Sequence, residues 1–136
     1  MSVVGLSISD ILKIITHIKK WVTNLLRAKE KRKEQSKDAL EAVILAVRKT
    51  MFYLSSLQRN GERSIENERE LMLLWTELSF SARKIKLKEL AGRCNDLGKY
   101  WANPSDFSKD FLSTAGNRLS DIERIAETIL DQIYKN

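Results

Sequence analysis

The sequence is poor in the residues on which turn-rich and disulfide-bonded folds depend. Its 136 residues include one proline and five glycines, too few for the many turns of a β-sandwich or β-barrel. Cys94 is the only cysteine, which excludes an intrachain disulfide and a metal site built from several thiolates. Proteins without disulfides are typical of reducing compartments, so we expect a cytoplasmic protein.

The N-terminal region has the pattern of neither a signal peptide nor a membrane span. Its apolar residues do not follow a basic stretch and do not form a clean run, so we expect no signal peptide. Basic side chains and a histidine interrupt residues 3–26, namely Lys13, His17, Lys19 and Lys20. A helix that crosses a bilayer would avoid them, so we expect no membrane span here.

The side chains that catalysis or cofactor binding would need are not grouped. His17 is the only histidine, and the residue three before it is Ile14, so the Glu-x-x-His spacing of a di-metal bundle is missing. The five glycines are scattered, which leaves no phosphate-binding loop, and no glycine-rich elbow surrounds Cys94. We therefore expect a non-catalytic protein with no cofactor, no metal and no small-molecule substrate.

Apolar residues recur every three or four positions, which is the pattern of amphipathic helices. We expect four helices, at about residues 9–26, 38–58, 65–102 and 105–136. Asn60-Gly61 and Asn103-Pro104 are stop signals, and the last helix could break near Ala115-Gly116. This pattern predicts an all-α fold, an antiparallel four-helix bundle. The length suits one hydrophobic core, so we expect a single domain over residues 1–136.

The segment from Arg27 to Lys37 is highly charged and has no glycine or proline. It could be a solvated connection, or the first helix could run straight through it, because most of its residues are good helix formers. We favour a break near Ser36, whose hydroxyl could cap the next helix.

The formal charge of +6 is concentrated in two segments. Residues 1–37 have a net charge of +6 and residues 83–101 of +4, whereas the rest of the chain is net negative. Clustered basic side chains bind nucleic-acid phosphates. The candidate contacts are Arg27, Lys29, Lys31, Arg32, Lys33, Lys37, Arg83, Lys84, Lys86, Lys88 and Arg93. The alternative is solvated surface, with Glu30 and Glu34 pairing with neighbouring lysines.

Two aromatic residues, Tyr100 and Trp101, lie at the C-terminal end of the second basic segment. Aromatic side chains among basic ones can stack on single-stranded bases. They can equally close the end of a hydrophobic core, which is the interpretation we favour.

The third predicted helix is apolar on two sides. Leu73, Phe80 and Leu87 recur at seven-residue spacing, away from the main apolar face that includes Leu71 and Leu78. A second apolar face is typical of a partner or oligomer interface. Residues 3–6 could instead fold back and cover it.

Three functional hypotheses follow. The leading one is a non-catalytic interaction module that self-associates or docks as an accessory subunit of a larger complex, through Leu73, Phe80 and Leu87. The alternative is a basic bundle that binds nucleic-acid phosphates with low sequence specificity. A weaker alternative is membrane-surface association through the amphipathic helix at 9–26.

Overall fold

Six helices make up almost all of the part of the chain that the structure describes. The structure is a computed structural model, and it describes residues 7–104 and 107–135. The helices are α1 (Ile8–Leu26), α2 (Glu30–Gln35), α3 (Lys37–Asn60), α4 (Ile65–Lys84), α5 (Lys88–Ala102) and α6 (Lys109–Lys135). These described residues contain no β-strand, and the predicted all-α helical bundle is confirmed. The alternative in which residues 3–6 fold back over the third predicted helix lies outside the described residues.

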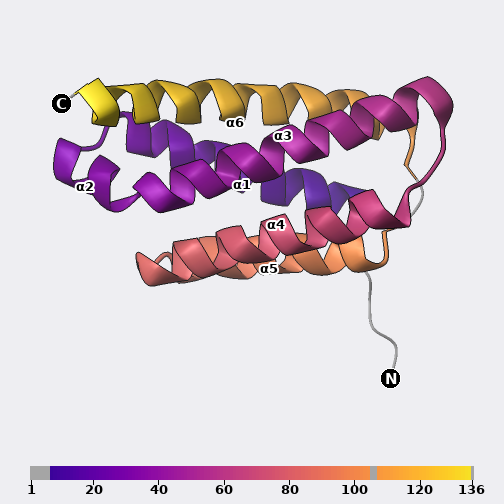
Figure 1. The fold of residues 1–136 in the computed structure, drawn as a ribbon, viewed down its shortest axis with the longest axis horizontal. Helices are drawn as coiled ribbons and strands as arrows, with labels where there is room; N and C mark the ends of the chain where they lie inside the picture. Colours follow the sequence, from indigo (N-terminus) through magenta and orange to yellow (C-terminus); the bar gives the residue numbers. More distant parts are fainter. Residues whose placement is uncertain (1–6, 105–106, 136) are drawn as a thin grey trace.

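The five long helices form a closed ring. Each packs against two others, in the cyclic order α1, α6, α3, α4, α5, and Figure 1 shows α6 along the upper edge with α4 and α5 below. Five is an odd number, so the helices cannot all be antiparallel to both neighbours. The parallel pair is α1 and α6, joined by Lys19 to Asp121 and by Thr16 to Arg118. The ring thus contains one more helix than the four predicted.

The extra helix arises because the predicted third helix reverses at residues 85–87. Lys86 has a φ of +64°, in the left-handed region. Its N–H donates to the carbonyl of Arg83, and the N–H of Leu87 donates to the carbonyl of Ala82. This is the hydrogen-bond pattern of a Schellman helix end. Because the left-handed residue is lysine rather than glycine, the sequence has no stop signal at this point.

The connection between α1 and α3 is the short helix α2. The predicted break at Ser36 is confirmed, since α2 ends at Gln35 and α3 begins at Lys37. The expected cap is not formed: the Ser36 hydroxyl donates to the carbonyl of Arg32, back along α2.

The last helix is continuous, and the break that the sequence allowed near Ala115-Gly116 does not occur. Ala115 is fully buried and continues the apolar stripe from Phe111 to Leu119. A glycine inside a helix costs about 1 kcal/mol relative to alanine. Burial of the stripe offsets this cost, so the glycine does not interrupt the helix.

The end of the bundle opposite α2 is closed by aromatic side chains. Trp101 lies edge-on to Tyr53 and Tyr100, and Phe107 stacks on Phe111. Tyr100 is 5% exposed and Trp101 is 2% exposed. These two residues therefore belong to the core, as we favoured, and are not available to stack on bases.

The close packing of α4 on α5 depends on Gly98. A Cβ at this position would lie 2.7 Å from Oγ1 of Thr76 and 3.2 Å from the carbonyl oxygen of Met72, whereas one at Gly92, in the same helix, would meet nothing within 4 Å. We predict that Gly98→Ala lowers the free energy of unfolding by about 1–3 kcal/mol. The control Gly92→Ala should raise it by up to about 1 kcal/mol.

Urea denaturation followed by circular dichroism measures both changes. Equal effects of the two substitutions would contradict the close approach at Gly98.

Candidate nucleic-acid interface

The two basic segments lie at the same end of the bundle. Helices α1 and α4 end there, and α3 and α5 begin there, so α2 and the α4–α5 turn are neighbours at the left end of Figure 1. Arg32 and Ser36 line a common pocket with Ile85 and Leu87, which are far away in sequence. The fold thus joins two surfaces that the sequence presents separately. We call residues 27–38 and 83–89 together the basic end.

The basic end contains the whole net charge of the chain. It has ten lysines and arginines against four acidic residues, a net charge of +6, which equals the formal charge of all 136 residues. The rest of the chain is therefore neutral overall. Such an asymmetric distribution produces a positive potential at one end that attracts anions.

Eight of these basic side chains are exposed and form no ion pair with any carboxylate in the described residues. They are Arg27, Lys29, Lys31, Arg32, Arg83, Lys84, Lys86 and Lys88. The proposed local pairing of Glu30 and Glu34 with lysines is not observed among these residues. The eight cations are thus free to pair with an external anion.

The other two basic side chains attach this end to α6. The Lys33 ammonium donates to Oε1 of Gln132 at 2.8 Å. The Lys37 ammonium lies 4.6 Å from the centre of the Tyr134 ring, and its hydrogen bond to this tyrosine raises the pKa of the lysine. These two lysines therefore help to hold α2 and α3 against the end of α6.

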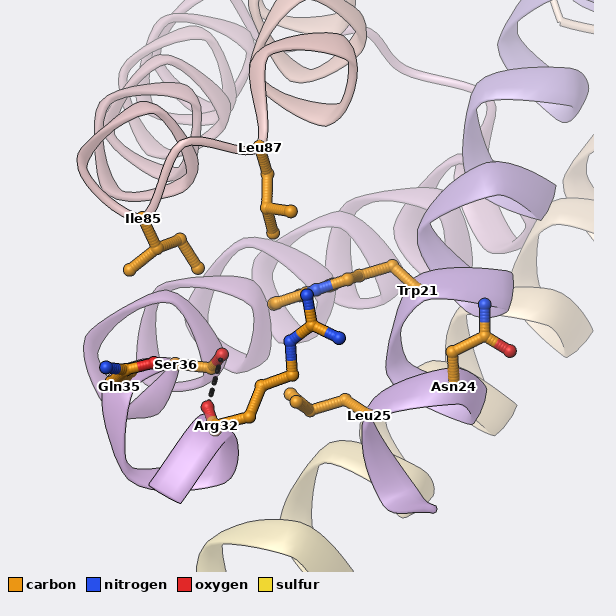
Figure 2. Close-up of a pocket in the computed structure, with 8 residues that line it drawn as sticks. All are labelled: Trp21, Asn24, Leu25, Arg32, Gln35, Ser36, Ile85 and Leu87. Atoms are coloured by element: carbon orange, nitrogen blue, oxygen red, sulfur yellow. Dashed lines mark hydrogen bonds between the residues drawn. The ribbon is translucent and has the colours of Figure 1, made fainter. Parts of the chain in front are cut away.

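A pocket of about 310 Å³ opens within the basic end (Figure 2). Its lining includes Trp21 and Asn24 of α1, which were not among the predicted contacts. The seven-residue spacing of Lys13, Lys20 and Arg27 indicates a basic face on α1, but no sequence signal connects Trp21 with residues 85–87. Only the packing of the helices brings them together.

Arg93, the last predicted phosphate contact, lies one helical turn beyond the basic end. It sits further along α5 and forms an ion pair of 3.0 Å with Glu89, one turn earlier. The hydrogen bond from Arg93 lowers the pKa of that carboxyl. Arg93 lines a separate shallow groove with His17 and Arg118.

Only two of the three residues of the predicted partner interface lie together on an exposed helix face. Leu73 and Phe80 are 57% and 50% exposed on α4, but Leu87 is not in line with them. Helix α4 ends at Lys84, so Leu87 lies in the turn, packs against the core and lines the pocket. Helix α3 presents a similar exposed pair, Leu45 and Phe52, also seven residues apart.

The one cysteine is buried, and the described residues hold no cluster of metal ligands. Cys94 is fully buried, and burial raises the pKa of its thiol to about 12, so the reactive thiolate is scarce at neutral pH. Within residues 7–104 and 107–135, no three His, Cys, Asp or Glu side chains gather as metal ligands do. No helix in the same ranges is both long and apolar enough to cross a bilayer.

Comparison with known proteins gives no information on the function of the chain. No family model matches the chain, and no curated protein or solved structure is significantly similar to it.

Proposed function

We propose that the protein binds nucleic-acid phosphates through its basic end, without catalysis and with low sequence specificity. The observation that supports this most strongly is the gathering of eight exposed, unpaired cations from two distant segments at one end of the bundle. Each phosphate that a lysine or arginine neutralises releases condensed counterions, which drives binding. Phosphate contacts position a nucleic acid and do not read its sequence.

A membrane surface fits this geometry less well than a nucleic acid. An interfacial helix binds lipid by inserting its apolar face. The apolar face of α1 is not available for insertion, since Ile11, Ile15 and Ile18 are at most 2% exposed in the core.

The left-handed backbone conformation of Lys86 also supports a role for its charged side chain in binding at the basic end. A residue other than glycine in the left-handed region costs about 1 kcal/mol or more. A lysine at this position is therefore less favourable for stability than a glycine would be. Strain of this kind is commonly found where a side chain serves binding.

We predict that charge reversal of exposed lysines at the basic end weakens nucleic-acid binding. Lys29→Glu with Lys31→Glu, and separately Lys84→Glu with Lys88→Glu, should each lower affinity by about tenfold or more. Each pair should also reduce the slope of log affinity against log salt concentration by about two. Fluorescence anisotropy with labelled single-stranded DNA, duplex DNA and structured RNA measures both quantities.

The matched control is Arg59→Glu with Lys99→Glu, an equal charge change at exposed positions outside the basic end. An equal loss in this control would show that total charge, not the basic end, determines binding. Absence of nucleic-acid binding at physiological salt would contradict the proposed function. So would a protein that co-sediments strongly with anionic vesicles but does not bind nucleic acid.

Replacement of Lys86 should separate stability from binding. We predict that Lys86→Gly raises the free energy of unfolding by about 1 kcal/mol, because glycine adopts a positive φ without strain. The same change should reduce the salt slope for nucleic acid by about one, since one phosphate contact is lost. Urea denaturation and anisotropy measure the two effects. A stabilised variant with unchanged salt dependence would exclude Lys86 as a contact.

We also propose a second candidate function, an interaction module that self-associates or docks as an accessory subunit of a larger complex. The observation that favours it is the exposure of Leu73 and Phe80 on α4, with Leu45 and Phe52 on the adjacent helix α3. Large apolar side chains grouped on a surface are typical of protein interfaces.

We predict that Leu73→Glu with Phe80→Glu converts a self-associated form into a monomer, because charges at a buried interface are strongly unfavourable. Light scattering coupled to size-exclusion chromatography gives the mass. Ser120→Glu with Thr128→Glu, at exposed positions on α6, is the control and should leave the mass unchanged. If the unmodified protein already has the mass of one chain, self-association is excluded.

A further inference from the structure

The pocket in the basic end is built from three separate elements (Figure 2). Trp21 and Leu25 come from α1, Arg32 from α2, and Ile85 and Leu87 from the α4–α5 turn. Its volume of about 310 Å³ is at the lower end of the range found for small-molecule sites. This is enough space for a flat ring system and too little for a folded peptide element.

The pocket combines apolar walls with an aromatic side chain. Leu25 is 3% exposed, and Trp21, Ile85 and Leu87 are half-buried and pack against the core. Nucleobases have two flat faces that stack on aromatic and apolar side chains regardless of base identity. The walls therefore suit the face of a base, which phosphate contacts alone do not recognise.

Polar groups in the pocket suit the edge of a base. The Arg32 guanidinium points into the space in Figure 2 and has no hydrogen bond or ion pair in the described part of the chain. It offers five N–H donors in a plane. Asn24 and Gln35 also line the pocket, and the carboxamide of each offers both a donor and an acceptor.

Cationic side chains flank the pocket along the chain. Lys31 precedes Arg32, Lys86 lies between the two turn residues of the lining, and Lys88 follows Leu87. All three are exposed. A nucleotide whose base enters the pocket would have its backbone phosphates near these charges.

We propose that this pocket receives one unpaired nucleobase, so that the basic end prefers single-stranded nucleic acid, or an unpaired position in a folded one, to a regular duplex. The inference rests on the proposed function, which supplies the phosphate contacts. In a duplex the faces of each base are stacked and its edge is paired. A duplex can therefore reach the lysines but cannot fill the pocket without extruding a base, which is costly.

The first test compares two single-stranded oligonucleotides with the same backbone, one with normal bases and one with abasic sites at its three central positions. The pocket predicts that the protein binds the normal strand at least about tenfold more tightly than the abasic strand. Arg32→Ala should remove most of this difference. The control Lys31→Ala deletes an equal charge at the adjacent exposed residue and should weaken binding to both strands equally.

The second test uses fluorescence. Of the three tryptophans, Trp75 and Trp101 are 0% and 2% exposed, whereas Trp21 is half-buried and lines the pocket. Stacking of a base in the pocket should quench the emission of Trp21. The quenching should be absent with the abasic strand and in Trp21→Phe.

The outcomes separate the two proposals. Binding of both strands with equal affinity, or equal effects of Arg32→Ala and Lys31→Ala, would overturn the base pocket and leave the phosphate interface intact. Failure to bind either strand at physiological salt would overturn the proposed function, and the pocket with it.

Discussion

The reversal of the chain at Lys86 is the constraint on which the rest of the structure depends. The left-handed residue ends α4 and turns α5 back against it. The bundle thereby gains a fifth long helix, and the odd number requires the parallel pairing of α1 with α6. The same turn places residues 83–89 beside α2 at one end. Without this reversal, the second basic segment would continue along a single helix, away from the first.

The helices were largely predictable because their apolar spacing reflects burial. Ile11, Ile15 and Ile18 are buried as their spacing indicates, and Gly61 ends α3 in the left-handed conformation. The glycines inside helices were less informative. Gly98 permits the close approach of α4 and does not end α5, and Gly116 lies within a continuous helix. At residues 85–87 the sequence has no glycine, so its pattern could not predict the turn there.

The candidate site was predictable in its charges but not in its shape. Arg27, Lys31 and Lys86 could be named as contacts because charge is a local property of the sequence. That the two segments share one end, and that Trp21 and Arg32 meet at a pocket there, depends on contacts between distant helices. Leu87 was predicted to lie in line with Leu73 and Phe80 because the prediction continued their helix through residue 87. Helix α4 in fact ends three residues earlier, at Lys84.

The most direct test of this account is to map the amide chemical shifts of ¹⁵N-labelled protein during titration with a single-stranded oligonucleotide. The basic end predicts that residues 27–37 and 83–88 respond together, at the same oligonucleotide concentration. Amides at the aromatic end, such as those of Gly61 and Ala102, should remain unchanged. A response confined to one of the two segments, or centred on Leu73 and Phe80, would contradict the claim that the fold joins the segments into one binding surface.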